Sequence, residues 1–224
     1  LTRLVLVNAL YLKAPWEEPF EESETGPRPF HLLDGSTVDV DTMTGQLALS
    51  RHGTGEGWEA VQLPYAGGEL AMTVILPDEG RLADVEARVA AGELDQLLAS
   101  LGPTMVDLTL PRWTFRSTSP LKDTLATVGM PTAFTDDADF LGMTSPETPS
   151  PERDLLIKDV LHETFIAVDE EGTEAAAATA VVMGLTSAPT YEPVVVDRSF
   201  LFVIHDVEHG TPLFLGRVTD PSQD

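Results

Sequence analysis

The sequence contains no cysteine, which excludes disulfide bonds and thiolate chemistry and leaves the redox compartment open. It has no apolar run long enough to span a bilayer, and its first residues lack the order of a secretion signal. Basic residues are scarce, with 13 against 37 acidic residues and a formal charge of −24. Because this charge repels phosphate backbones, anionic lipids and sulfated polysaccharides, we expect no nucleic acid, membrane or polyanion cofactor as a partner.

The familiar signatures of catalysis are also missing. There is no glycine-rich phosphate loop, no His-Glu pair at metalloprotease spacing and no serine in a nucleophile elbow. The segment TDDADF, residues 135–140, has three aspartates but lacks the glycine and distal glutamate of a calcium loop. We interpret it as a solvated loop, with metal binding as the alternative. The sequence therefore predicts no catalytic residue, no metal and no cofactor.

Strand and turn patterns dominate the 224 residues, of which 42% are apolar, enough for a real core. Alternation and turn residues predict strands within residues 27–43, 57–80, 105–115, 154–170 and 200–218, with turns at Asp34-Gly35 and His209-Gly210. Helical spacing predicts two short helices between Leu82 and Leu101, broken at Gly92, and a third from Pro120 to Val128. The predicted class is α+β.

The first strand has an unusual pattern. In LVLVNALYLKAPW the residues from Leu4 to Leu12 form a nearly unbroken apolar run. An unbroken run predicts a strand that is covered on both faces and central in its sheet. Since a central strand needs neighbours, we expect this sequence to be the C-terminal part of a longer chain.

The segment EEGTEAAAATAVVMGLTS, residues 170–187, has very little to pack. One interpretation is a helix through the alanines that is capped by Thr173. The other is a strand, in which Thr173 and every second residue share one face while Glu174 carries the only charge, on the opposite face. Small side chains make it sterically easy for such a strand to insert between two existing strands, so the segment could be exposed or inserted.

Several motifs together resemble one family. EEGTEAAAAT is similar to the hinge of the reactive-centre loop of an inhibitory serpin, where small residues fill the stretch that enters the central sheet. LVLVNALYLKAPWEEPF resembles a serpin strand, although Ala14 stands where the family usually has glycine. VQLPY, VILPDEG, LHETFIAVDEEGTEA, FLFVIHD and PLFLGRVTDPSQ resemble further serpin segments in the same order. The resemblance covers essentially all 224 residues.

The resemblance implies the serpin fold: a central mixed sheet, two further sheets and helices. It also implies that the N-terminal helical part and the first strands are absent, that residues 1–224 are the C-terminal part of a single domain, and that the reactive-centre loop is about residues 170–196. Inhibition is then expected to require the missing portion. Ten of the 13 basic residues are arginine, which with many alanines favours a bacterial source.

The family's mechanism is suicide inhibition of a serine protease, so we expect an inhibitor and not an enzyme. The protease cleaves the exposed loop, and the loop inserts as a strand that traps the distorted acyl-enzyme. The thirteen steps from Thr173 to Thr186 would span roughly 43 Å. We expect a monomer that is extracellular or secreted, with the cytoplasm as the alternative.

The usual loop length of the family places the scissile bond between Thr186 and Ser187, with Leu185–Thr186 as second choice. No lysine or arginine occurs from Gly172 until Arg198, so a trypsin-like pocket has nothing to bind. We expect elastase-like, chymotrypsin-like or subtilisin-like partners with apolar or small pockets.

The resemblance also assigns roles to individual side chains, each with a simpler alternative. Asn8 and His162 match the shutter that locks the central sheet, although each could be an ordinary buried polar residue that needs a partner. Trp16 matches the breach where insertion begins, although core packing would equally explain it. The hinge comprises Glu170, Glu171, Gly172, Thr173, Glu174, Ala175, Ala176, Ala177, Ala178 and Thr179. Glu170 and Glu171 are either a latch or a solvated charge pair.

Two other function classes remain open at this stage. A non-inhibitory serpin would be a binding or chaperone-like protein whose loop never inserts, but such relatives tend to carry bulky, charged or proline residues in the hinge. Between Gly172 and Val182 the only such residue is Glu174, so the hinge favours inhibition. An unrelated enzyme of mixed class is the third hypothesis.

Overall fold

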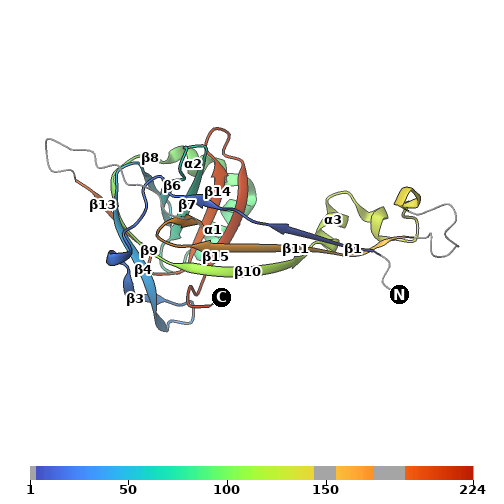
Figure 1. Cartoon of the computed structure of the whole chain (residues 1–224), viewed down its shortest axis with the longest axis horizontal. Helices are drawn as coiled ribbons and strands as arrows, with labels where there is room; N and C mark the ends of the chain where they lie inside the picture. The colour runs from blue at the N-terminus through green and yellow to red at the C-terminus, as the bar shows by residue number, and fades with distance from the viewer. Residues whose placement is uncertain (1–3, 144–154, 174–189, 224) are drawn as a thin grey trace. The chain divides into compact units, whose positions relative to one another are not determined.

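The computed structural model describes residues 4–143, 155–173 and 190–223 (Figure 1). The chain divides into two compact units. Unit 1 is Leu1–Tyr11 with Phe115–Phe165, and unit 2 is Leu12–Thr114 with Ile166–Asp224. The predicted α+β class is confirmed, because the described residues form three sheets with a few short helices.

Unit 1 is built on two parallel strands. β1 (Leu4–Leu10) pairs with β11 (Ile157–Val168) from Leu4 opposite Ile157 to Leu10 opposite Thr164. β10 (Trp113–Pro120) also pairs with β11. A helix follows as predicted, but α3 is only Lys122–Thr127, because Pro120 still belongs to β10 and Leu121 takes the cap position. Two 3-10 turns, Pro131–Phe134 and Leu141–Met143, follow it.

The prediction that the first strand is covered on both faces is wrong for this chain. β1 lies at the end of its sheet, and its partner among the described strands is β11. Its side chains are exposed, and Val7 is 65% accessible. The unbroken apolar pattern indicates a strand that needs cover on two faces. The described part of the chain does not supply that cover.

Unit 2 contains two sheets. The four-stranded sheet has the order β13 (Glu192–Val195), β9 (Val106–Pro111), β4 (Thr37–Leu47) and β3 (Gly26–His31). The six-stranded sheet has the order β15 (Pro212–Val218), β14 (Phe200–Asp206), β7 (Leu70–Pro77), β6 (Trp58–Pro64), β5 (Arg51–Gly55) and β8 (Gly102–Pro103). A 3-10 turn, Glu22–Glu24, precedes β3. The predicted turns are present, with Gly35 and Gly210 at φ 84° and 70°.

One predicted strand of unit 2 is in fact two. Residues 105–115 divide into β9 and β10 at Arg112, whose backbone N–H donates to the Asp41 carbonyl (2.8 Å). The apolar residues on both sides of Arg112 are typical of one continuous strand. The hydrophobicity of the sequence therefore gives no sign of the break. The predicted range 170–196 also contains a strand, since β13 pairs in parallel with β9.

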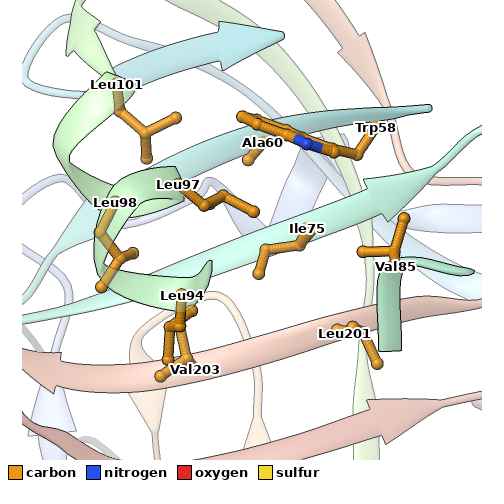
Figure 2. Packing of buried hydrophobic residues seen from close by; sticks show 10 residues of the cluster. All are labelled: Trp58, Ala60, Ile75, Val85, Leu94, Leu97, Leu98, Leu101, Leu201 and Val203. Carbon is orange, nitrogen blue, oxygen red and sulfur yellow. The ribbon is translucent and has the colours of Figure 1, made fainter. Parts of the chain in front are cut away.

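The helices of unit 2 cover one face of the six-stranded sheet (Figure 2). α1 (Leu82–Arg88) and α2 (Leu94–Ser100) flank a π-helical turn, Val89–Glu93, in which Gly92 has φ 92° and breaks the helix as predicted. Leucines of α2 pack on the indole of Trp58 and on Ile75. Alternation sends Phe200 and Phe202 to the opposite face, where both contact Trp113. No helix in the described ranges is long and apolar enough to cross a membrane.

His205 predicts a pH dependence of stability. It is buried on β14, between the Thr73 hydroxyl (3.0 Å from Nε2) and the Asp206 carbonyl (3.1 Å from Nδ1). Burial lowers the pKa of His205 below its usual 6.5, despite the nearby Asp206 carboxylate. The unfolded chain therefore binds the proton more tightly, so this contribution is present above pH 6.5 and is lost as the pH falls through the folded pKa. We expect the free energy of unfolding to fall less steeply between pH 7.5 and 5 in the His205→Gln variant than in the unsubstituted protein. Equal slopes in His205→Gln and in the unsubstituted protein would contradict this assignment.

Candidate functional site

A tight turn carries the chain from β11 into the predicted hinge. The backbone N–H of Asp169 donates to the Gly172 carbonyl (3.0 Å), and the Asp169 carboxylate accepts from the N–H groups of Glu171 (3.0 Å) and Gly172 (3.2 Å). The next residues, Gly172–Thr173, form β12, which is antiparallel to β11 with Thr173 opposite Val168. The hinge therefore begins as the second strand of a hairpin.

β12 has a partner on its other side as well. Gly172 lies opposite Pro15 and Thr173 lies opposite Ala14, in an antiparallel pairing with β2 (Ala14–Pro15). Both β12 residues are buried, and Thr173 is 1% accessible. We call this two-residue position between β11 and β2 the seat.

Gly172 cannot be replaced in the seat without strain. Its φ of +146° is a conformation that side chains rarely adopt. A Cβ atom would collide with the Ala14 carbonyl oxygen and lie 2.7 Å from Pro15 Cα and 2.9 Å from the Trp16 nitrogen. These neighbours are backbone atoms, so a small rotation of a side chain cannot relieve the clash.

Two stacked aromatic rings form the floor of the seat. Trp16 and Tyr65 are each 1% accessible, and their rings stack at 4.6 Å and 8°. The Trp16 indole Nε1–H donates to the Asp169 carbonyl (3.0 Å), and its backbone N–H donates to the Glu171 carbonyl (2.9 Å). The Tyr65 hydroxyl hydrogen-bonds the Thr173 hydroxyl (2.7 Å). Burial raises the pKa of Tyr65 well above its usual 10, so its hydroxyl keeps its proton.

Glu170 is a buried carboxylate beside the seat. It is 4% accessible, its Oε1 accepts from the Thr25 hydroxyl (2.6 Å), and its Oε2 lies 3.5 Å from Nε of Arg112. Its carbonyl accepts from the Phe20 N–H (2.9 Å). The Arg112 side chain is 45% accessible, so the ion pair joins a desolvated anion to a half-solvated cation. Glu170 is therefore not part of a solvated charge pair, and its role as a latch stays a prediction.

Burial raises the pKa of the Asp169 carboxyl group, partly offset by the two backbone N–H donors. The raised pKa means that this carboxyl group contributes stability below its usual 3.8 and loses that contribution as the pH rises through the folded pKa. In its ionised form, the Asp169 carboxylate is stabilised by these N–H donors, which oppose the cost of its desolvation.

The predicted shutter residues lie together in unit 1. Asn8 and His162 are paired across the β1–β11 ladder, and His162 Nδ1 is 3.0 Å from Asn8 Oδ1. Because an amide oxygen only accepts, Nδ1–H donates, which leaves Nε2 to accept from the Thr164 hydroxyl (3.1 Å). The expectation that both side chains are buried is wrong, since Asn8 is exposed and His162 is half-buried. β1 has no cover in the described chain.

Asn8 and His162 should be energetically coupled, but weakly. An exposed hydrogen bond competes with water, so we expect a coupling of about 0.5 kcal/mol. The measurement is a urea unfolding series of Asn8→Ala, His162→Ala and the double variant. Additive losses would mean that the two side chains do not act as a pair.

The predicted residues fall into three groups. Trp16, Glu170, Glu171, Gly172 and Thr173 are brought together at the seat, and Asn8 with His162 lie in the other unit. The remaining hinge positions Glu174–Thr179 and the predicted scissile positions Leu185, Thr186 and Ser187 lie outside the described residues. Sequence analysis missed Tyr65, Arg112 and Thr25, although VQLPY, which contains Tyr65, was among the matching motifs.

Comparison with known proteins explains this arrangement. A family model for serpins, described as serine protease inhibitors, matches residues 1–221. The chain belongs to the serpin family. A serpin-like protein of Thermococcus kodakarensis, itself uncharacterized, is 40% identical over 227 residues, which are 99% of this chain and 50% of that protein. This archaeal relative agrees with a prokaryotic member of the family, and the bacterial source stays a prediction.

Solved serpin structures superimpose closely on the fold. One of them is Serpin48, described as a highly specific serpin of the insect Tenebrio molitor. It matches 98% of this chain with a TM-score of 0.81 and 32% identity. Human thyroxine-binding globulin, solved with its hormone, matches 98% with a TM-score of 0.80 and 28% identity. This serpin spans 57% and 56% of those two chains and about half the length of its curated relatives. Its family is that of protease inhibitors and not of enzymes.

Proposed function

We propose that this serpin inhibits a serine protease as a suicide substrate, with residues of about 170–196 as the reactive-centre loop. The protease attacks the loop and forms an acyl-enzyme, and the freed loop then extends β12 into the central sheet. The observation that carries the proposal is the seat, in which β12 is already paired on both sides with β11 and β2. A loop that never inserts would need no such start.

Strand directions support insertion. β1 and β11 are parallel, and β12 is antiparallel to β11 and to β2, which follows β1 in the chain. A strand that continues β12 between the segments 4–15 and 157–168 would be antiparallel to both. Insertion would separate the seven residue pairs of one parallel ladder and form two antiparallel ladders, which are slightly more stable per residue.

The length of the loop also fits. The thirteen steps from Thr173 to Thr186 would span roughly 43 Å, and the twelve-residue β11 extends about 36 Å. At about 1 kcal/mol net for each new hydrogen bond, a full strand would release on the order of 10 kcal/mol. The resting state is then metastable, and cleavage releases the difference.

We propose a partner protease with an apolar or small specificity pocket, of the elastase, chymotrypsin or subtilisin type. Thr186–Ser187 is the proposed scissile bond and Leu185–Thr186 the second choice. No basic side chain occurs between Gly172 and Arg198, which argues against a trypsin-like partner. We further propose an extracellular, monomeric inhibitor.

The test incubates the complete gene product that contains this sequence with elastase, chymotrypsin, subtilisin and trypsin in separate reactions. Denaturing gels and mass spectrometry of the released peptide follow. We expect a detergent-stable covalent complex with at least one of the first three enzymes and a peptide that begins at Ser187. Cleavage of the loop without a complex by any enzyme would instead support a non-inhibitory binding or chaperone-like serpin.

A further inference from the structure

The start of the loop is held by a hydrogen bond that no prediction from the sequence included. The hydroxyl groups of Tyr65 and Thr173 are 2.7 Å apart and both residues are 1% accessible. The bond joins Thr173 of the predicted hinge to Tyr65, which lies 108 positions away in the sequence. The bond therefore links the predicted start of the loop to the residue that follows β6 of the six-stranded sheet.

Tyr65 is held mainly by residues outside the predicted hinge. It follows β6, its N–H donates to the Leu70 carbonyl (2.9 Å), and it forms a β-bridge with Trp16. The Tyr65 ring stacks on the Trp16 indole, whose Nε1–H donates to the Asp169 carbonyl. The hydroxyl thus has a defined position before Thr173 arrives, which is the requirement for a positioning residue.

We propose that Tyr65 is a positioning residue for loop insertion: its hydroxyl keeps Thr173 seated before cleavage, so that the inserted strand starts in one fixed register. A side-chain period of two makes register critical, since a slip by one residue would turn Glu174 toward the opposite face. The consequence for trapping rests on the proposed inhibitory function. Whether Gly172 and Thr173 occupy the seat can be measured without a protease.

Hydrogen–deuterium exchange of the uncleaved complete gene product provides the direct test. Tyr65→Phe removes the hydroxyl and keeps the ring on Trp16, while Thr173→Val removes the other hydroxyl and keeps the β-branched shape. We expect each variant to lower the protection of the Gly172 and Thr173 amides about fivefold, the change expected from one neutral hydrogen bond. The double variant should lose no more than either single variant, because one bond is lost in all three.

Two controls separate the bond from general destabilisation. Thr173→Ser retains a hydroxyl and should keep most of the protection. Core amides of Ile75 and Val203 should exchange as in the unsubstituted protein. Unchanged protection at Gly172 and Thr173 in both single variants, or losses that add in the double variant, would overturn the proposal.

A protease assay then tests the consequence. If the chain traps an elastase-like enzyme, Tyr65→Phe should raise the number of inhibitor molecules consumed per trapped protease by about two- to fivefold, with the unfolding temperature changed little. An unchanged number would overturn the role of Tyr65 in insertion. If the unsubstituted protein traps no protease, the proposed function fails, and the exchange experiment still decides whether Tyr65 holds the seat.

Discussion

Replacing Gly172 with alanine is expected to empty the seat and to convert the proposed inhibitor into a plain substrate. The substitution adds a Cβ against three backbone neighbours and imposes a side chain at φ +146°. Overpacking and backbone strain each cost about 1–3 kcal/mol, so the seated state should lose about 3 kcal/mol or more relative to an unseated hinge. This is more than a hundredfold change in the seated population.

The expected result is a covalent complex reduced at least tenfold in yield, with the loop cleaved at an unchanged rate. Gly129→Ala is the matched control, because Gly129 has φ +124° and nothing lies within 4 Å of an added Cβ. It carries the backbone strain without the clash. A Gly172→Ala protein that traps protease as well as the control would show that the seat is not needed for insertion.

The two partners of the ion pair between Arg112 and Glu170 should differ in how much stability is lost when each is replaced. Arg112→Met leaves the buried Glu170 carboxylate without its cation, whereas Glu170→Gln leaves an arginine that is already 45% accessible to water. The penalty for an uncompensated charge falls on the desolvated partner. We expect a loss of about 2–3 kcal/mol for Arg112→Met and about 1 kcal/mol for Glu170→Gln.

The double variant gives the sharper comparison. Because glutamine carries no charge, Arg112→Met combined with Glu170→Gln should be more stable than Arg112→Met alone. Urea unfolding at pH 7 measures all three. Equal losses in the single variants, or a double variant less stable than both, would mean that desolvation of Glu170 does not govern this contact.

The sequence was enough to predict the class, the main hairpins and the helix break, because each depends on local signals. Gly35, Gly92 and Gly210 stand where the backbone needs positive φ, and hydrophobic periodicity sets the flanking elements. Gly172, Trp16 and the two glutamates were selected through the resemblance. These residues lie close together in the structure, and their roles stay predictions.

Other features could not be predicted because they depend on the folded surroundings. Tyr65 looks like any aromatic residue after a strand until Thr173 arrives beside its hydroxyl. Arg112 was assigned to a continuous strand, since the sequence does not show that β9 pairs with β4 whereas β10 pairs with β11. The pattern of β1 correctly indicated a strand, but burial depends on the elements that pack against it.

The central claim is that the loop inserts and stabilises the sheet when it is cut. The most direct measurement is the thermal unfolding of the complete gene product before and after limited cleavage of the loop. An inserted strand worth about 10 kcal/mol should raise the unfolding temperature by about 10 to 20 °C in a protein of about twice this length. An unfolding temperature that stays the same or falls after verified cleavage within residues 174–189 would contradict insertion and the inhibitory mechanism built on it.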